Sequence, residues 1–142
     1  MTGQRILGLD VGDRTVGVAA SDLLLMTAQG VETIRRETLE KDLARLGELM
    51  REYDAVRLVV GLPRNMNGTE GDRCEIVRAF AEEIKKALPE ADIVFWDERL
   101  STVAAAKSLI QADVSRKKRK KVIDKMAAVF ILQGYLDGLS AK

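Results

Sequence analysis

Three carboxylate positions that lie far apart in the chain have the residue types and the placement to perform chemistry together. Asp10 ends one apolar run, Asp97 and Glu98 end another, and Asp124 lies among apolar residues spaced as on one face of a helix. Parallel strands end at one edge of a sheet, where α/β folds bind ligands. Adjacent strand residues point to opposite faces, so only one of Asp97 and Glu98 shares the face of Asp10 unless the strand has already ended. We expect Asp10, Asp124 and one acid of that pair to meet.

Acids that converge in this way need a cation. Two unit charges about 4 Å apart repel by about 4 kcal/mol at an effective dielectric near 20, so three would not stay ionised together without a counter-ion. Oxygen ligands suit Mg²⁺ or Mn²⁺. These ions cut phosphodiesters by generating a hydroxide nucleophile and by stabilising the leaving oxygen. The chain has no histidine, which excludes a Ser-His-Asp or Cys-His mechanism within one subunit and histidine-bearing zinc sites.

Each acid also has a simpler structural explanation. Asp10 could start a turn, a common role of aspartate. Glu98 could pair with Arg99 or cap the helix that follows. Asp124 could be a helix N-terminal acid, favoured by the helix dipole and by the lysines just before it. The conjunction of two strand ends and one apolar helix face favours the shared site.

The hydrophobic pattern predicts the elements that would position these residues. Strands over 5–10, 15–20 and about 28–34 form an antiparallel meander, and buried parallel strands follow at 58–62 and 93–96. Helices are expected after Thr38, before Pro89, after Ser101 and around 123–131. The simplest architecture is an α/β fold, a mixed five-stranded sheet flanked by helices. The length of 142 residues predicts a single domain over 1–142.

Basic residues are concentrated in one run. The chain has 23 Lys and Arg against 22 Asp and Glu, so its net charge does not indicate a class of binding partner. Six of the basic residues are nevertheless consecutive: Arg116, Lys117, Lys118, Arg119, Lys120 and Lys121. The run leads into the predicted helix that carries Asp124, so a phosphate backbone attracted to the run would be brought to the acids. The simpler interpretation is that the run is a solvated loop. If the run neutralises about four phosphates of a duplex, the log–log salt slope of binding should be near −3.6.

Further contacts to nucleic acid are expected near the acids. Arg14 and Arg99 could hold the scissile phosphate, or they could be ordinary partners of Asp13 and Glu98. The loop with Asn65, Asn67 and Gly68 could bind phosphate through backbone N–H groups, or it could be a plain strand-to-helix turn. Aromatic residues make up only 4% of the chain, so recognition of backbone and shape is expected rather than base stacking.

Four segments of the chain, in order, resemble the YqgF family, also called RuvX, of the ribonuclease H-like superfamily: 7–22, 60–71, 96–102 and 124–137. The most specific are Gly61-Leu-Pro-Arg-Asn-Met-Asn-Gly68 and Asp97-Glu-Arg-Leu100. The resemblance implies a ribonuclease H-like fold and a metal-dependent nuclease, with Asp10, Glu98 and Asp124 matching the family's acids and Asp97 remaining the alternative. The family was first assigned as Holliday junction resolvases and is now more often linked to maturation of the 5′ end of pre-16S ribosomal RNA.

The sequence is therefore consistent with four hypotheses about function. A nuclease that processes pre-16S rRNA is expected first. A resolvase of four-way DNA junctions is the alternative, and it would need a dimer with two sites. Asp10-Val-Gly12 followed by Gly17 also resembles the first phosphate motif of actin-like and sugar-kinase ATPases, which suggests a nucleotide-binding module. A non-catalytic ribosome-assembly protein of the same fold is the fourth hypothesis.

The sequence also predicts where the protein works. Its start does not read as a signal peptide. Its longest uncharged stretch, 126–136, is shorter than the ~20 apolar residues that span a bilayer. The single cysteine, Cys74, cannot form an internal disulfide, which fits a reducing compartment. We expect a cytoplasmic protein, monomeric or homodimeric, that binds nucleic acid and no membrane.

Overall fold

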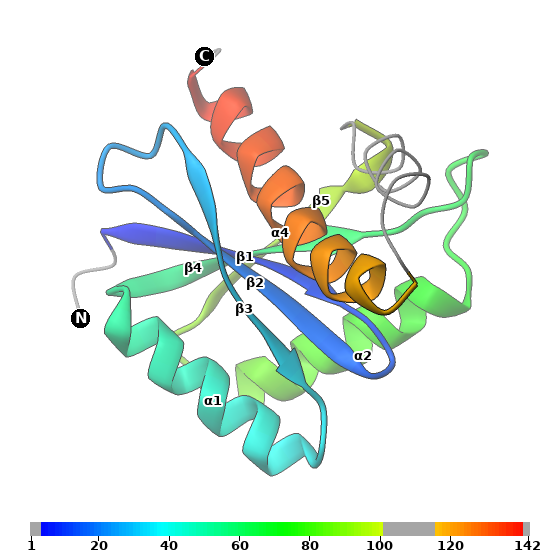
Figure 1. The fold of residues 1–142 in the computed structure, drawn as a ribbon, viewed down its shortest axis with the longest axis horizontal. Coiled ribbons are helices and arrows are strands. Elements are labelled where there is room, and N and C mark those ends of the chain that lie inside the picture. The colour runs from blue at the N-terminus through cyan, green and yellow to red at the C-terminus, as the bar shows by residue number, and fades with distance from the viewer. Residues whose placement is uncertain (1–3, 101–115, 141–142) are drawn as a thin grey trace.

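The computed structural model describes the backbone of residues 4–100 and 116–140 and the side chains of residues 4–99 and 126–139. The expected helix after Ser101 lies outside the described residues. Figure 1 shows the arrangement of the elements. In chain order they are β1 (Arg5–Val11), β2 (Thr15–Ser21), β3 (Ala28–Arg35), α1 (Leu39–Glu52), β4 (Ala55–Leu62), α2 (Asp72–Ala87), β5 (Asp92–Asp97), a 3-10 turn (Glu98–Leu100) and α4 (Arg116–Ser140).

The five strands form one mixed sheet in the order β3-β2-β1-β4-β5. The pairs β1–β2 and β2–β3 are antiparallel, whereas β1–β4 and β4–β5 are parallel. This confirms the expected meander with two added parallel strands. The parallel strands β1, β4 and β5 therefore end at the same edge of the sheet, which we call the carboxyl edge.

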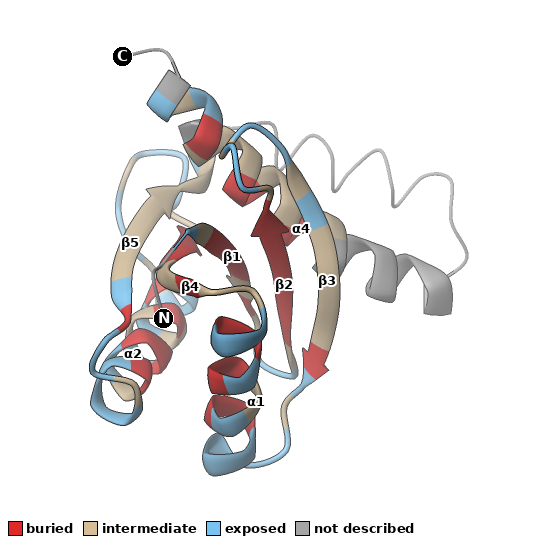
Figure 2. Cartoon of the chain, turned by 90° about the vertical axis from the view of Figure 1, so that its left-hand side faces the viewer, coloured by how far each residue is buried: buried red, intermediate tan, exposed pale blue. Residues whose placement is uncertain are grey.

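Helices cover the two faces of the sheet unequally (Figures 1 and 2). On one face, α1 and α2 close a large aliphatic core, to which β1 contributes Leu7, Leu9 and Val11. On the other face α4 closes a smaller core with Ile6 of β1 and Val59 of β4. Because side chains alternate along a strand, the two cores take alternate residues of β1 and β4.

Glycines on the central strands bring α4 close to the sheet. A Cβ atom at Gly8 of β1 would lie 2.6 Å from Leu132 Cβ and 3.0 Å from the Ala128 carbonyl oxygen. A Cβ atom at Gly61 of β4 would lie 2.9 Å from Ile131 Cγ1. Real Cβ atoms essentially never come closer than 3.0 Å to such neighbours, so Leu132 and Ile131 of α4 lie directly over the backbone of Gly8 and Gly61.

Small residues on α4 also accommodate the tryptophan of β5. The ring of Trp96 meets that of Tyr135 edge to face, with centroids 6.1 Å apart. A Cβ atom at Gly134 would lie 3.2 Å from Trp96 Nε1. The C-terminal half of α4 is thereby fitted against β5.

The local signals for α1 act as expected. The Thr38 hydroxyl accepts a hydrogen bond from Lys41 N at 3.2 Å, which satisfies one donor at the start of the helix. Asp42 in the first turn is buried and accepts a hydrogen bond from Glu37 N. Among the described residues, no helix has the length and apolarity needed to cross a membrane.

The basic run lies in a different element from the one predicted from the sequence. The run was expected to precede the helix around 123–131, and the simpler interpretation was a solvated loop. Instead α4 begins at Arg116, so the run forms the first turns of the helix. Lysine and arginine are good helix formers, and the apolar stretch that follows continues the helix against the sheet.

Candidate active site

Asp10 lies inside β1 and on the face of the sheet that α4 covers. It is half-buried and opposes Gly17 of β2. Ile6 and Gly8 face α4, so alternation puts Asp10 on the same face. The turn after β1 closes only at Gly12, whose N–H donates to the Thr15 carbonyl at 2.8 Å, so Asp10 precedes that turn.

Glu98 reaches the same face from β5. The strand ends at Asp97, and Glu98 begins the 3-10 turn. The Cγ atom of Glu98 lies 3.3 Å from the position of a Cβ atom at Gly61, the same position that meets Ile131 of α4. The missing side chain of Gly61 therefore leaves room for the Glu98 side chain over β4, on the face that α4 covers.

The strand register relates Asp10 to the position over which Glu98 packs. Leu9 of β1 pairs with Val60 of β4. The next residues along the two strands are Asp10 and Gly61, and neighbouring strands lie about 4.8 Å apart. Glu98 packs over Gly61 with its Cγ atom, so this atom and Asp10 lie on the same face of the sheet, over neighbouring strands at the carboxyl edge.

Asp124 lies in α4, and its side chain is outside the described part. The path of the helix backbone shows where its turn lies. The Tyr135 hydroxyl accepts a hydrogen bond from Arg57 Nη1, near the start of β4, at 3.1 Å. Ala128 lies over Gly8 in the middle of β1. Traced from Tyr135 back to Ala128 the helix advances toward the carboxyl edge, and Asp124 is one turn further along.

The donor set fits a hard divalent cation. Asp10 and Glu98 offer carboxylate oxygens, the ligands that Mg²⁺ and Mn²⁺ prefer. Among the described side chains, no three histidine, cysteine, aspartate or glutamate residues form a group that could hold a metal ion. The expected third acid is Asp124, whose side chain does not belong to that set.

Asp97 pairs with Arg99. Its Oδ2 atom accepts a hydrogen bond from Arg99 Nη2 at 2.7 Å, and its Oδ1 atom accepts one from Arg99 N at 3.0 Å. Arg64 Nη1 approaches the same carboxylate at 3.9 Å. The Arg99 side-chain hydrogen bond lowers the pKa of Asp97 most, with help from the Arg99 backbone and from Arg64. Between the two candidates for the second acid, the geometry favours Glu98.

Arg99 connects this corner to the loop 63–71. It pairs with Asp97, whereas the sequence had suggested Glu98 as its charge partner. Its Nη1 atom also donates to the Met66 carbonyl at 3.4 Å. Gly68 has a φ of +87°, and a Cβ atom there would lie 3.2 Å from Arg99 Nη1. The guanidinium therefore packs against the loop while it bonds the strand end.

The asparagines of this loop hold its own turn. Asn65 Nδ2 donates to Thr69 Oγ1 at 3.0 Å, and Asn67 Oδ1 accepts from Thr69 N at 3.1 Å. The loop follows β4 at the carboxyl edge, as the hypothesis of phosphate binding requires. Its backbone conformation is fixed by these bonds, whatever Asn65 and Asn67 touch in addition.

Arg14 is exposed in the turn between β1 and β2. Arg36, which sequence reasoning did not single out, clamps this turn at two points. Its Nη1 atom donates to the Gly12 carbonyl at 2.8 Å, and its backbone N–H donates to the Arg14 carbonyl at 2.8 Å. No local spacing signals this contact. The side chains of the basic run Arg116, Lys117, Lys118, Arg119, Lys120 and Lys121 lie outside the described residues.

Sequence reasoning also missed Arg64 and its chain of ion pairs. Arg64 approaches Glu70 at 3.6 Å, and Glu70 is bound through both oxygens by Arg78 of α2. With Asp97, this chain runs from α2 through the loop to the end of β5. The sequence feature that could have indicated Arg64 is its position just after the end of a strand, which Arg99 shares.

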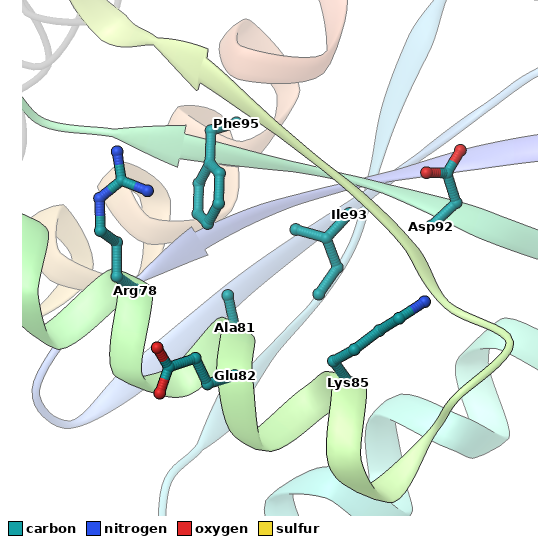
Figure 3. Close-up of a pocket in the computed structure, with 7 residues that line it drawn as sticks. All are labelled: Arg78, Ala81, Glu82, Lys85, Asp92, Ile93 and Phe95. Atoms are coloured by element: carbon teal, nitrogen blue, oxygen red, sulfur yellow. The ribbon is translucent and has the colours of Figure 1, made fainter.

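Two cavities lie on the other face of the sheet. One of about 360 Å³ lies between α2 and β5, and Figure 3 shows that Arg78 and Phe95 stand at one end of it and Lys85 and Asp92 at the other. A second cavity of about 470 Å³ lies beside Tyr53. Neither is lined by Asp10 or Glu98.

Comparison with known proteins gives consistent relatives. A family model, "RuvX: Holliday junction resolvase", matches residues 4–138. The chain is 64% identical over 133 residues to a protein of Desulforamulus reducens named "Putative pre-16S rRNA nuclease", covering 94% of this chain and 96% of that one. It is 60% identical over 140 residues to a protein of the same name from Symbiobacterium thermophilum, covering 97% and 95%.

Solved structures share the fold at low sequence identity. Thermus thermophilus RuvC in complex with a Holliday junction substrate matches with a TM-score of 0.61 and 13% identity, over 98% of each chain. The fowlpox virus Holliday junction resolvase matches with a TM-score of 0.53 and 17% identity, over 95% of this chain and 99% of that one. These matches confirm the expected ribonuclease H-like fold. The family model over residues 4–138 and the relatives that are 60% or more identical show that this chain belongs to the RuvX family.

Proposed function

We propose that this protein is a metal-dependent endonuclease that hydrolyses phosphodiester bonds in structured nucleic acid, and that its substrate is the 5′ end of pre-16S rRNA. The observation that carries the proposal is the placement of Asp10 on β1 and of the Glu98 Cγ atom over Gly61 of β4, on the same face at the carboxyl edge. The name of the relatives that are 60% or more identical supports the choice of substrate.

The three acids are held in place by different elements of the fold. Asp10, Glu98 and Asp124 would hold Mg²⁺ or Mn²⁺, which when bound activates water and stabilises the leaving oxygen. Asp10 is fixed by strand pairing on β1, whereas Glu98 is fixed by the end of β5 and by packing over Gly61. Asp97 stays ionised and holds the Arg99 guanidinium at the same corner. Arg99 would thereby present positive charge beside the site to a phosphate of the substrate.

The binding surface would extend from this corner along the carboxyl edge. Arg14 stands on the turn after β1, and the loop with Asn65 and Asn67 follows β4. The basic run Arg116–Lys121 forms the start of α4, the helix that carries Asp124. Contacts to several phosphates predict binding that falls steeply with salt. A nuclease of ribosomal precursors would work in the cytoplasm.

A four-way DNA junction is the second candidate substrate. The family description, Holliday junction resolvase, supports it. Two symmetric cuts on opposed strands require two sites related by a two-fold axis. This candidate therefore predicts a homodimer at working concentration, whereas cleavage of a ribosomal precursor is compatible with a monomer.

One cleavage assay tests the proposal and separates the substrates. Purified protein is given a pre-16S rRNA fragment and a four-way DNA junction side by side, with Mg²⁺ or Mn²⁺ and with EDTA. We expect metal-dependent cuts in the RNA that Asp10→Asn, Glu98→Gln and Asp124→Asn each abolish, while Asp13→Asn, at an exposed turn position, keeps activity. Cleavage of the junction alone would favour the resolvase. Wild-type protein that cuts neither substrate would contradict a nuclease.

In that last case, calorimetry with ATP and Mg²⁺ would test the nucleotide-binding hypothesis. Complementation in cells by Asp10→Asn would instead support a non-catalytic assembly protein.

A further inference from the structure

Met66 is the most exposed large apolar residue among the described side chains. It is 94% exposed, compared with 76% for Leu24 and 62% for Met26. Single exposed apolar residues are common and by themselves carry no meaning. The position of Met66 is what distinguishes it, because it stands at the tip of the loop that follows β4 at the carboxyl edge.

The loop holds Met66 out by its own hydrogen bonds. Gly68 N donates to the Asn65 carbonyl at 2.9 Å, and Asn65 N donates to the Thr69 carbonyl at 2.9 Å. Gly68 supplies the positive φ that closes this turn. Because the backbone on both sides of Met66 is already bonded, a ligand that meets the side chain does not have to order the loop.

Arg99 fixes the tip relative to the paired acids. Its guanidinium bonds the Met66 carbonyl and, through Asp97, the end of β5, and the residue between Asp97 and Arg99 is Glu98. Figure 1 shows the loop between β4 and α2 projecting beyond the end of the sheet, on the side where β1 and β4 end. A strand held at the acids and at Arg99 would therefore pass within reach of the Met66 side chain.

We propose that Met66 packs against the face of a nucleobase next to the phosphate that is cut. This inference rests on the proposed nuclease function and adds a contact to a base. A thioether is polarisable and packs well against aromatic rings, and methionine is among the apolar side chains that wedge between bases. The face of a base is open only where stacking is broken. Met66 would therefore favour cutting beside an unpaired or bulged nucleotide over cutting in a continuous helix.

Fluorescence of a substituted base tests the contact directly. Asp10→Asn protein, which would bind without cutting, is mixed with precursor RNAs that carry 2-aminopurine at successive positions around the cut. We expect one position whose fluorescence changes on binding, and we expect Met66→Ala in the same background to remove that change. Met66→Ala should weaken binding by about 2- to 10-fold, whereas Met66→Leu should retain most of the affinity and of the signal.

Met26→Ala is the matched control. Met26 is also exposed, but it lies in the loop between β2 and β3, at the opposite edge of the sheet. It should change neither affinity nor fluorescence. Thermal unfolding of each variant identifies a loss of fold, and the leucine variant keeps the test decisive if the alanine variant is unstable.

The outcomes for the contact and for the nuclease are separable. If Met66→Ala binds and fluoresces as its parent does at every position while Asp10→Asn abolishes cutting, the base contact is wrong and the nuclease proposal stands. A loss of affinity with the fluorescence change intact would also overturn the contact. If the wild type cuts no substrate but the Met66-dependent signal is present, the nuclease proposal fails and the inference is overturned as a contact beside a cut, although Met66 still binds a base.

Discussion

The two faces of the sheet are built from different residues. Toward α1 and α2 the central strands present large aliphatic side chains, such as Leu7 and Leu9 of β1 and Leu58 of β4. Toward α4 the same strands present Gly8 and Gly61, and α4 contributes the small residues Ala127 and Ala128 to the core on this face. The first face holds the larger aliphatic core, whereas on the second the smaller core lets α4 approach the backbone of Gly8 and Gly61 closely.

The two faces therefore have different roles: one mainly stabilises the fold, and the other sets the position of the helix that carries Asp124. Burial of aliphatic side chains supplies most of the free energy of folding, so the face of α1 and α2 is where stability is concentrated. On the face of α4, the closeness of the helix determines how near its acid, Asp124, can come to Asp10 and Glu98. We therefore expect substitutions on the two faces to act on different measurements.

Removal of a paired acid should give the largest effect. Asp10→Asn or Glu98→Gln should lower kcat by about 10³-fold, since the lost metal contact is worth several kcal/mol in the transition state. Thermal stability without metal should change little, because both acids are only half-buried and each amide keeps the shape of the acid that it replaces. Cleavage rates and thermal melts check this, with Asp13→Asn as the control. An acid variant that melts much earlier would show that the acids hold the fold instead.

A large-to-small change on the opposite face should affect stability alone. Leu46 of α1 is 1% exposed. Leu46→Ala should lower the free energy of unfolding by about 2–5 kcal/mol through lost burial and a cavity. Urea titration measures this loss, and kcat of the folded fraction should stay at the wild-type value. Leu24→Ala, at an exposed position, should change stability by less than about 0.5 kcal/mol. A large fall in kcat for Leu46→Ala would contradict the separation of the two faces.

An added methyl group should separate α4 from the sheet. Gly8→Ala places a Cβ atom against Leu132 and the Ala128 carbonyl, and such overpacking costs about 1–3 kcal/mol. We expect lower stability together with a fall in kcat, because the helix that carries Asp124 must shift. Gly138→Ala makes the same substitution within α4, where the nearest atom, in Trp96, would be 3.8 Å away. This control should raise stability by up to about 1 kcal/mol. Equal effects of the two variants would show that close approach at Gly8 is unimportant.

The smallest effect should appear as a pH dependence of stability. A hydrogen bond from Arg45 lowers the pKa of Glu32 on β3. A lowered folded-state pKa contributes stability above the unfolded pKa, and this contribution is lost as the pH falls through the folded value. Stability should thus decline below about pH 5, and Glu32→Gln should make that decline shallower without changing kcat. Urea midpoints between pH 3 and 7 measure it, and parallel curves for the two proteins would exclude the pair as a contributor.

The strands and helices could be predicted because their signals are local. Alternation revealed the meander, and Thr38 marked the start of α1. The carboxyl edge followed from topology alone, which is why Asp10 and the end of β5 were found together. The start of α4 was misplaced because a run of like charges resembles a loop when only its hydration is considered.

Side-chain partners across the fold could not be predicted in the same way. The choice between Asp97 and Glu98 depends on where β5 stops, and the hydrogen bonds of Arg99 to Asp97 mark that point. Arg36 lies 24 residues from its partner Gly12. Contacts of this kind depend on how elements pack, and no periodicity in the sequence records them.

Trp96 gives the molecule a built-in optical probe. It is the only tryptophan of the chain, and its indole nitrogen is shielded from solvent against α4. It stands two residues before Glu98 and edge-on to Tyr135, so its emission depends on how α4 seats against β5. Titration of Mg²⁺ or Mn²⁺ while this single fluorophore is recorded would follow ion binding without a label and without a substrate. The fluorescence of Trp96 would thus report the position of the helix that carries Asp124.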